Sequence, residues 1–486
     1  MTTPRHWLGQ CYRLFERVLL ARLPAKAQRA TALVLFAVCK RLLPSTRWPG
    51  LKERLLLRRQ IFAPPKQHRS LPPQALDDML DLALHVDQAL APDRFLSNAP
   101  AVLLAPVHWT QAGHAYRRIL SQLADREYET IILIPWLKHG GADLGALHHA
   151  RACVEIFGQR TLVIATEPGE SPWAERLPGK AEFLPIGAEL ANLSNAMCEP
   201  EMVLARLLIQ LAPVRVHLIN SHVGWRTIER YGLAIRQGSR LFASLYCDER
   251  DRNGVRSGLA QNHLPTSWQW LDAVISDNSV SPREWTETMG IKPELFHTVH
   301  FPCPVDSPAP PRGHAPACHR LLWASRFEAQ KRPDLLVELA KLLPEFQWDV
   351  YGEPLAKDDE YHCALQRLNN VTLHGKYETF LEIVRPDHLA YVYTTAWDGL
   401  PNVLLEAAAA DLPIVAPDIG GIRDLLPREL LLPAGAQAAD YALAIRALTT
   451  TSRRDSHLLK QRPMLEMFTW EQFAKHMARI GGYTGT

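Results

Sequence analysis

The stretch that decides the fold reads TTAWDGLPNVLLEAAAADLPIVAPDIGGIRDLL (residues 394–426). An apolar strand is predicted just before it, over His388–Tyr393, and a helix is predicted within it, from about Pro401 to about Asp411. A second buried strand over Pro413–Ala416 then leads into a loop at Gly420-Gly421. A strand, a helix and a strand in this order predict one unit of a parallel sheet, with polar residues gathered where strands meet helices.

Two carboxylates flank the start of this helix. Asp398 is expected in the loop after the first strand, and Glu406 on the helix, four residues after Asn402 and therefore on the same face. The start of a helix offers unpaired backbone N–H groups and the positive end of a dipole, which suit phosphate. Carboxylates accept hydrogen bonds from sugar hydroxyls. The pattern therefore predicts a site for a phosphorylated sugar.

With its carboxylates eight positions apart, the stretch resembles the retaining glycosyltransferases of family 4, which carry a Glu-x7-Glu motif in a GT-B fold. Here the motif reads Asp398-x7-Glu406, so the first Glu is replaced by an Asp that is one methylene shorter. The resemblance covers roughly Thr130–Thr486 and is strongest after Arg320. It associates Asp398 with the donor sugar and Glu406 with the nucleotide ribose. The alternative is an ordinary doubly wound segment with Glu406 on its surface.

Two cations follow a further strand, predicted over Arg320–Ala324. Arg326 and Lys331 come shortly after it, and Arg332-Pro333-Asp334 predicts a helix start, because proline is favoured at the first helical position. Both cations are therefore expected at the carboxyl end of a strand, where open α/β sheets bind ligands. A pyrophosphate leaving group gains negative charge and needs fixed cations. Members of the resembled family carry such an Arg and Lys at the diphosphate; an isolated pair would instead be solvated surface.

A glycine pair, Gly140-Gly141, follows the strongest strand of the N-terminal half, Thr130–Pro135. Glycines at a strand-to-helix turn let backbone N–H groups approach an anion closely. The resembled family has a glycine-rich loop here, facing donor phosphate and acceptor, although turns need glycine in any case. The expected nucleotide-sugar site therefore comprises Gly140, Gly141, Arg326, Lys331, Asn402 and Glu406. No G-x-G-x-x-G follows the strand, which argues against a nicotinamide enzyme.

The acceptor side is expected near Asp248, which follows a strand predicted over Leu241–Tyr246. Many members of the resembled family place a His at the end of this strand, where this chain has Tyr246-Cys247-Asp248, and His222 is a candidate to fill part of that space. The alternative roles of Asp248 are a helix cap or a solvated charge. With Arg326, Lys331 and Asp398, it completes the predicted catalytic set. No metal is expected, because two cations and a helix dipole would already face the diphosphate.

Composition and charge bound the class of protein. At 486 residues, 47% hydrophobic and 22% charged, the chain predicts two or three globular domains. Its eight cysteines show no C-x-x-C and no zinc spacing, so a reducing cytoplasm is the simplest compartment. The net charge is +3, but residues 1–70 hold 15 Lys and Arg against two acidic residues, so this segment carries +13 and the other 416 residues carry −10.

This basic N-terminal arm interleaves its cations with apolar residues over Trp7–Leu43 and Trp48–Phe62, as interfacial amphipathic helices do. Its longest uncharged run, Ala30–Cys39, has ten residues, whereas a bilayer span takes about 20. No signal peptide or transmembrane helix is expected. The arm predicts attachment to an anionic membrane surface from the cytoplasmic side; the alternatives are a helical cap on the acidic remainder and a nucleic-acid arm. No nucleic-acid module is recognisable, so nucleic acid is not an expected partner.

The fold expected is α/β, a GT-B arrangement of two Rossmann-like parallel-sheet domains facing a cleft, with an added helical N-terminal arm. Further strands are predicted at Ala101–Pro106, Thr161–Ala165, Val214–Ile219 and Ala273–Ser276, and a proline-rich stretch is expected to join the domains. In the resembled family the last helix crosses back onto the first domain. The divisions expected are an arm at 1–99, an acceptor domain at 100–301, a linker at 302–318, a donor domain at 319–465 and a crossover helix at 466–486.

The predicted function is retaining, metal-independent transfer of a sugar from a nucleotide-diphosphate donor to an acceptor hydroxyl. The donor is a co-substrate, and no cofactor is expected. The arm and the habit of the family point to a lipid-linked or cell-surface polysaccharide as acceptor. Two alternatives stay open: a nucleotide-sugar epimerase or synthase on the same fold, and a non-catalytic membrane-attached module, which the Asp at position 398 keeps in view.

Overall fold

A computed structural model describes residues 111–484, apart from 124–126, 252–253, 304–318, 355 and 357. Two compact units are distinguished, Met1–His114 and Ala115–Thr486, and nearly all described residues belong to the second. The basic arm, the strand predicted over Ala101–Pro106 and most of the predicted linker lie outside the described residues. No helix in the described part of the chain is long and apolar enough to cross a membrane.

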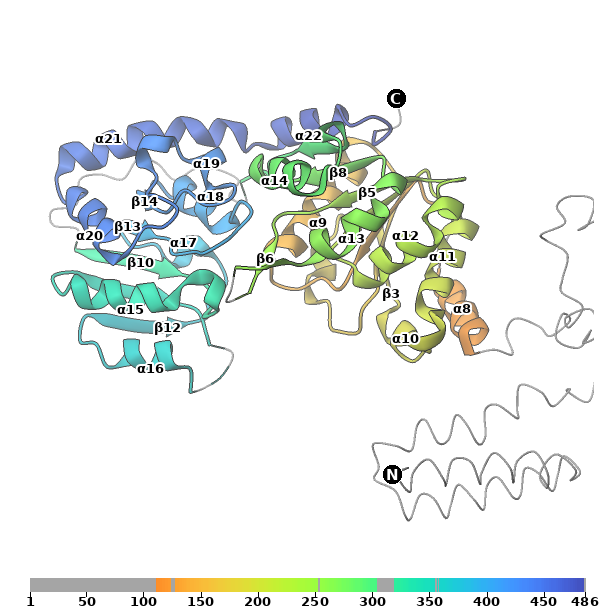
Figure 1. The fold of residues 1–486 in the computed structure, drawn as a ribbon, viewed down its shortest axis with the longest axis horizontal. Coiled ribbons are helices and arrows are strands. Elements are labelled where there is room, and N and C mark those ends of the chain that lie inside the picture. The colour runs from red at the N-terminus through yellow and green to blue at the C-terminus, as the bar shows by residue number, and fades with distance from the viewer. Residues whose placement is uncertain are drawn as a thin grey trace, which may run out of the picture. The chain divides into compact units, whose positions relative to one another are not determined.

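The first sheet of the second unit, sheet A, has seven parallel strands in the order β3-β2-β1-β4-β5-β8-β9. Figure 1 draws it in the orange-to-green part of the chain, with β3, β5 and β8 labelled. Its strands are β1 (Thr130–Ile134), β2 (Thr161–Ala165), β3 (Ala181–Pro185), β4 (Arg215–Ile219), β5 (Arg240–Ser244), β8 (Ala273–Ser276) and β9 (Phe296–Thr298). Four of the five inner strands, β2, β1, β4 and β8, are buried along their whole length, as expected for a parallel sheet covered on both faces.

The helices that follow these strands are α9 (Gly141–Arg151), α10 (Gly187–Ala191), α11 (Glu199–Leu211), α12 (His222–Ile235), α13 (Leu259–Ser267) and α14 (Val280–Met289), with α8 (Gln111–Gln122) before β1. A short antiparallel hairpin, β6 (Glu249–Arg250) and β7 (Arg256–Ser257), follows β5. The sequence did not reveal β3 and β9 because both are edge strands. Their residues are mostly half-buried, so neither forms the buried apolar run that marks a central strand.

The second sheet, sheet C, has five parallel strands in the order β12-β11-β10-β13-β14. The strands are β10 (Arg320–Ala324), β11 (Gln347–Tyr351), β12 (Val371–Gly375), β13 (His388–Val392) and β14 (Ile414–Val415). Its helices are α15 (Pro333–Leu342), α16 (Glu360–Gln366), α17 (Phe380–Ile383), α18 (Asn402–Ala409), α19 (Ile422–Leu425) and α20 (Ala438–Ala447). The α15 and α18 starts fall within one residue of the positions that Arg332-Pro333 and Pro401 predicted.

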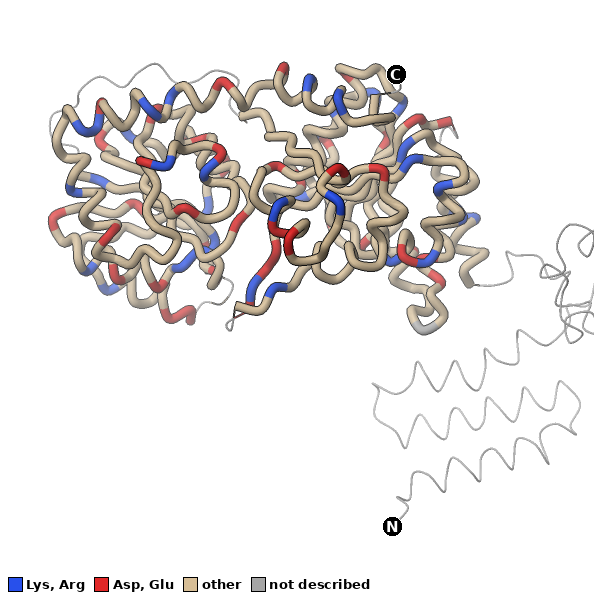
Figure 2. Tube along the Cα trace, turned by 45° about the horizontal axis from the view of Figure 1, so that its top comes forward, with Lys and Arg blue, Asp and Glu red and all other residues tan. Residues whose placement is uncertain are grey.

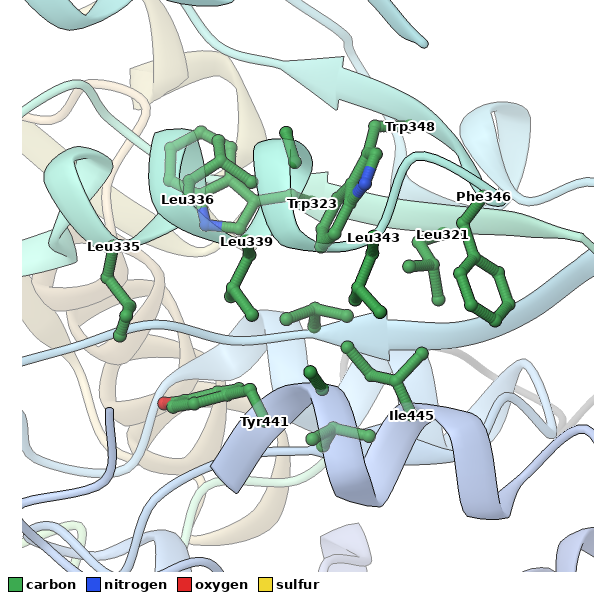
Figure 3. Close-up of a cluster of buried hydrophobic side chains, with 14 of the residues drawn as sticks. Leu321, Trp323, Leu335, Leu336, Leu339, Leu343, Phe346, Trp348, Tyr441 and Ile445 are labelled. Carbon is green, nitrogen blue, oxygen red and sulfur yellow. The ribbon is translucent and has the colours of Figure 1, made fainter. Parts of the chain in front are cut away.

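Alternate residues of β10 point to opposite faces of sheet C, so each face has its own core. Leu321 and Trp323 pack with α15 and α20, whereas Leu322 and Ala324 pack with α17 and α18. Figure 3 shows the first of these cores: one row of leucines from α15 meets Trp323 of β10, Trp348 of β11 and the Tyr441 end of α20. The two-faced burial holds the carboxyl ends of the strands in fixed positions.

The C-terminal segment returns to sheet A. After α21 (Thr451–Gln461), helix α22 (Trp470–Ala478) places Phe473 and Met477 in a core with Phe242 of β5. Tyr483 follows them, and its hydroxyl lies 2.7 Å from Nδ1 of His217 on β4. Where the chain passes between the sheets for the second time, the N–H of Cys303 donates to the carbonyl of Phe468 at 2.8 Å, so the two crossing segments lie side by side.

Candidate active site

Each sheet has one point where the strand order reverses. In sheet C the chain leaves β10 toward β11 and leaves β13 toward β14 on the other side, and β10 and β13 are neighbours. In sheet A the corresponding neighbours are β1 and β4. Open parallel sheets bind ligands in the crevice at such points, outside the carboxyl ends of the strands. Most of the residues predicted from the sequence lie at these two places.

At the sheet C point, Lys331 and Asp398 meet. The Lys331 ammonium donates a short hydrogen bond to Oδ2 of Asp398 and a second, of 2.6 Å, to the hydroxyl of Tyr393. That hydroxyl donates to the same Oδ2 at 2.5 Å. The side chains of Lys331 and Asp398 are only 12% and 14% exposed, so the cation and the carboxylate are fixed. The other oxygen of Asp398, Oδ1, receives no recorded hydrogen bond from the described residues.

The loop after β10 is fastened to the loop after β13 by backbone and side-chain bonds. The Thr394 hydroxyl donates to the carbonyl of Lys331 at 2.6 Å and accepts from Nε1 of Trp323 at 2.9 Å. The amide of Gln330 donates to the carbonyl of Trp397 at 2.8 Å, and the N–H of Ala396 donates to the carbonyl of Gln330. These bonds align Lys331 with Asp398 before any ligand is present.

Arg326 is placed differently from Lys331, although the sequence paired them. Its side chain is 67% exposed, and its guanidinium donates to Glu328 at 2.9 Å and to Gln330 at 3.4 Å. It therefore lies on the same loop as Lys331, which begins at the end of β10, but outside the group of Lys331, Tyr393 and Asp398.

Helix α18 begins beside this group and carries the other predicted contacts. Pro401 precedes it and no side chain caps it, so its first N–H groups have no side-chain acceptor. Asn402 is its first residue; Oδ1 of Asn402 is shielded from solvent and accepts no hydrogen bond within the described chain. Burial raises the pKa of Glu406, one turn later, to about 7. A half-buried carboxyl with no recorded partner is a candidate acceptor for hydroxyl groups.

Gly420 and Gly421 pack directly on the Asp398 loop. Gly420 has φ +53°, and a Cβ there would come within 1.9 Å of the carbonyl oxygen of Asp398. The N–H of Gly421 donates to the carbonyl of Gly399 at 2.9 Å. Only a glycine fits this left-handed, close approach. The loop at Gly420-Gly421 therefore packs against the loop that carries Asp398 and supports it.

Two residues near Asp398 were not predicted as site residues, and both follow strands of sheet A. Asp277 follows β8 and accepts from the N–H of Leu400 at 3.4 Å, and burial raises its pKa to about 7. Cys247 follows β5; burial and then the charge of Asp398 raise the pKa of its thiol. Cys247 thus lies at the site, at the strand end where the resembled family has a His. The sequence showed that Cys247 ends a strand but not which loop of the other sheet it meets.

Asp248, predicted on the acceptor side, is buried and held by three donors. Its carboxylate accepts from Nε1 of Trp285 at 2.9 Å, from Nε2 of Gln261 at 2.8 Å and from Arg256 at 3.3 Å. It is therefore neither a helix cap nor a solvated charge, the two alternatives considered. With both oxygens occupied, Asp248 fixes α13 and α14 beside the end of β5, which makes it a positioning residue in this structure.

A pocket of about 430 Å³ lies at the sheet A point. It is lined from the ends of β1 and β4, the starts of α9 and α12, and the β6–β7 hairpin, including Trp136, Asp143, Asn220, His222 and Glu249. Gly140 and Gly141 stand at the start of α9, and a Cβ on Gly141 would lie 3.5 Å from Nδ2 of Asn402. The predicted glycine pair thus lies beside Asn402 of α18, and His222 lines the pocket.

Among the described residues, no group of three or more His, Cys, Asp or Glu side chains is arranged to hold a metal ion. The positive groups at the sheet C point are the Lys331 ammonium and the N-terminal end of α18.

Comparison with protein families gives a match in the C-terminal half of the chain. Residues 318–451 fit a family model described as "Glycosyl transferases group 1", a range that begins just before β10 and ends at the start of α21. Among curated proteins, a D-inositol 3-phosphate glycosyltransferase of Rhodococcus erythropolis is 24% identical over 366 residues, covering 66% of this chain and 80% of that protein. A protein of the same name from Geodermatophilus obscurus is 30% identical over 182 residues, covering 34% and 40%.

Comparison with solved structures gives the fold. The apo form of the lipopolysaccharide outer core galactosyltransferase WaaB matches with a TM-score of 0.57 and 15% identity, over 72% of this chain and 98% of that one. HepE from Anabaena, in complex with UDP-glucose, matches with a TM-score of 0.56 and 15% identity over the same shares. The predicted fold class is confirmed: two parallel-sheet, Rossmann-like domains in a GT-B arrangement. Together, the family match and the curated relatives support a glycosyltransferase of the GT-B type.

Proposed function

We propose that the protein transfers a sugar from a nucleotide-diphosphate donor to an acceptor hydroxyl with retention of configuration, as the resemblance to family 4 implies. One observation carries the proposal. Lys331, Tyr393 and Asp398 form a fixed, mostly buried group beside the uncapped start of α18. A cation, a carboxylate and a helix start in one place fit the two chemistries of a nucleotide sugar, diphosphate and hydroxyl.

Lys331 has three N–H bonds, and two are donated to Asp398 and Tyr393. The third is left for a phosphate oxygen of the donor. Because the ammonium is already held in place, it stabilises charge that develops on the leaving group without reorganising. Arg326 adds a second, exposed cation that would have to leave Glu328 to reach the diphosphate. These side chains, together with the helix dipole, make a metal-independent reaction the proposal.

In the transfer step, the bond between the anomeric carbon and the diphosphate oxygen breaks, and the acceptor oxygen forms a bond to that carbon on the same face. The acceptor proton passes to the leaving phosphate, so no enzymic nucleophile is required. Asp398 would accept from a hydroxyl of the donor sugar through Oδ1, since its known bonds all end on Oδ2. Glu406 and Asn402 on α18 would hold the nucleotide, with the Glu406 carboxylate at the ribose.

The donor and the acceptor are proposed by class. HepE, one of the similar structures, was solved with UDP-glucose, which makes UDP-sugars the first donors to test. The acceptor would enter from the sheet A pocket, which Gly141 places next to Asn402. WaaB acts on a lipopolysaccharide outer core, and a lipid-linked or cell-surface polysaccharide is the acceptor class we propose here.

The test measures release of UDP from a set of UDP-sugars, with and without added acceptors, by the purified full chain. We expect slow release without acceptor, because water replaces it, and faster release with a suitable sugar. A chain that binds UDP-sugars but releases no nucleotide under any condition would be the non-catalytic module. An epimerase would convert the sugar of the donor without releasing UDP, and chromatography of the recovered donor would reveal it.

For localisation we propose peripheral attachment to the cytoplasmic face of a membrane through residues 1–70, whose net charge is +13. Binding of the full chain to vesicles should rise with the fraction of anionic lipid. It should fall as the Debye length shrinks from ~10 Å at 0.1 M salt to ~3 Å at 1 M. A chain beginning at Leu71 should lose this binding and keep its affinity for UDP. If the shortened chain aggregates, the arm is instead a structural cap.

A further inference from the structure

The sheet A pocket has a charge pattern that selects among acceptors, and this inference rests on the glycosyltransferase function proposed above. Two helices, α9 and α12, begin at the pocket. A helix start is ordinarily a place for an anion, because its first N–H groups point outward and carry the positive end of the dipole. A carboxylate of the protein lies near each of these helix starts: Asp143 near α9, where it also lines the pocket, and Glu167 near α12.

At the start of α9, the carboxylate belongs to Asp143 in the first turn. Its Oδ1 accepts from the N–H of Lys138 at 3.0 Å, and its Oδ2 lies 2.6 Å from where a Cβ on Gly140 would stand. The carboxylate therefore covers the glycine that begins the helix. A phosphate arriving at this helix start would meet a negative charge in its place.

At the start of α12, the carboxylate belongs to Glu167, which follows β2. Its Oε1 accepts from the N–H of Val223 at 3.0 Å, and its Oε2 accepts from the hydroxyl of Thr166 at 2.9 Å. The hydroxyl oxygen of Ser221 accepts a hydrogen bond from the N–H of Gly224 at 2.8 Å. The first turn of α12 is thus satisfied from inside the protein.

A third carboxylate, Glu249, is exposed on the β6–β7 hairpin and lines the pocket. No Lys or Arg side chain is among the residues that line it within the described chain. Two cations lie near it: the Lys138 ammonium is 4.0 Å from the ring of Trp136, which lines the pocket, and Arg256 pairs with Asp248 and Glu284. The pocket therefore combines an aromatic wall with carboxylates and uncharged polar groups.

We propose that this pocket accepts a neutral, polyhydroxylated sugar unit and rejects units that carry phosphate or carboxylate next to the reacting hydroxyl. Hydroxyl groups can donate to Glu249 and bond with Asn220 and His222, which also line the pocket. A phosphate would lie close to the like charges of Asp143 and Glu249, which disfavours its binding. In a lipid-linked acceptor, any phosphate must then be remote from the sugar that receives the transfer.

The test uses the full chain and the UDP-sugar that it turns over, with an equimolar pool of glucose, galactose, mannose and myo-inositol together with the phosphate ester of each. Products are counted by mass spectrometry. We expect at least tenfold more neutral than phosphorylated product. Glu249→Lys should reduce this ratio at least fivefold, whereas Glu287→Lys, a charge reversal on the exposed side of α14, should leave it unchanged.

A predominance of phosphorylated product in the wild type would overturn the inference, and so would an unchanged ratio in Glu249→Lys. If the donor is hydrolysed but no member of the pool receives sugar, the pocket does not take neutral sugar units and the inference also fails. Absence of any UDP release is a different result, because it removes the proposed function and this inference with it.

Discussion

The two places where the strand order reverses are built in opposite ways. At the sheet C point, Lys331, Tyr393 and Asp398 bond to one another and are nearly buried. At the sheet A point, carboxylates face helix starts, and about 430 Å³ is left open between exposed side chains such as Glu249. A prearranged group suits a ligand part common to many donors, the diphosphate. An open pocket with few fixed partners leaves room for an acceptor particular to this chain. The comparison predicts that substitutions at the first point affect every reaction, and those at the second affect the choice of acceptor.

The largest effect is expected from Lys331→Ala, which removes the fixed cation and leaves Asp398 without its ion pair. Turnover of the UDP-sugar should fall by about 10² or more, as for removal of a preorganised charge-stabilising donor. Arg326→Ala should cost about tenfold, since its side chain is 67% exposed. Lys341→Ala, an exposed lysine in the last turn of α15, is the control for loss of a positive charge. Equal losses in Lys341→Ala and Lys331→Ala would remove the proposed diphosphate site.

A smaller loss is expected from Gly420→Ala, because the added Cβ would meet the carbonyl oxygen of Asp398 at 1.9 Å and would sit at φ +53°. The loop must shift, and a displacement of about 1 Å can cost up to about 10²-fold in rate. Gly435→Ala is the matched control, since nothing lies within 4 Å of its Cβ position. Steady-state turnover and melting temperature, measured together, separate displacement of the loop from unfolding. Wild-type turnover in Gly420→Ala would show that the site is less rigid than the comparison requires.

Glu406 gives a pH-dependent effect of about tenfold. Burial raises its pKa to about 7, so the folded protein binds its proton more tightly than the unfolded chain does. Its contribution to stability therefore falls as pH rises from about 4.5 to about 7. The melting temperature of the wild type should therefore decrease over this pH range, and that of Glu406→Gln should not show this decrease, because it has no carboxyl group at position 406. Its affinity for UDP should be weaker by about tenfold at pH 8, where the wild-type carboxylate is ionised and accepts from the ribose.

The matched measurement for Glu406 is the difference between the two proteins at each pH, which cancels the titration of UDP itself and that of Asp277, whose pKa burial also raises to about 7. A difference that stays constant from pH 5 to pH 8 would show that Glu406 does not contact the nucleotide as an ionised group. The assignment of the second carboxylate to the ribose would then be wrong.

The smallest effect on turnover is expected from Asp248→Asn. Its three donors fix α13 and α14, so the substitution should lower the free energy of unfolding by about 1–3 kcal/mol. Turnover at a temperature where the variant is folded should fall less than tenfold. Urea unfolding and steady-state kinetics test the two halves of this statement. A loss of turnover as large as that of Lys331→Ala, without a loss of stability, would restore Asp248 to the catalytic set.

The sequence predicted those features of the fold that depend on the local pattern of residues. The strands at Thr161–Ala165, Ala273–Ser276 and Arg320–Ala324 begin and end where expected, because each is a short buried apolar run with polar or glycine-containing flanks. The positions of Lys331 and Asp398 at strand ends followed from the same pattern. The sequence did not predict that Lys331 and Asp398 bond to each other or that Tyr393 bonds to both. These contacts depend on which strands are neighbours in the sheet.

Contacts between the sheets lay beyond sequence reasoning. Nothing near Asp277 or Cys247 in the chain marks either residue as a neighbour of Asp398, which is more than a hundred positions away. Asp248 stands in a run of charges that reads as solvated surface, yet it is buried by a tryptophan from α14. Arg326 has the spacing of a phosphate ligand, but the choice between that role and a bond with Glu328 depends on side-chain geometry.

The hydrogen bond between Cys303 and Phe468 has a mechanical consequence. The chain passes between the two sheets twice, and this hydrogen bond joins the two crossing segments at one place. Because the two crossing segments are joined there, they resist twisting of one sheet domain against the other. Rotation about the place where they meet is the least restricted motion. Other polar contacts also join the two sheet domains: the N–H of Leu400 donates to Asp277, and the N–H and hydroxyl of Ser279 donate to Asp424. Rotation of one sheet domain against the other would have to break these polar contacts of Asp277 and Asp424.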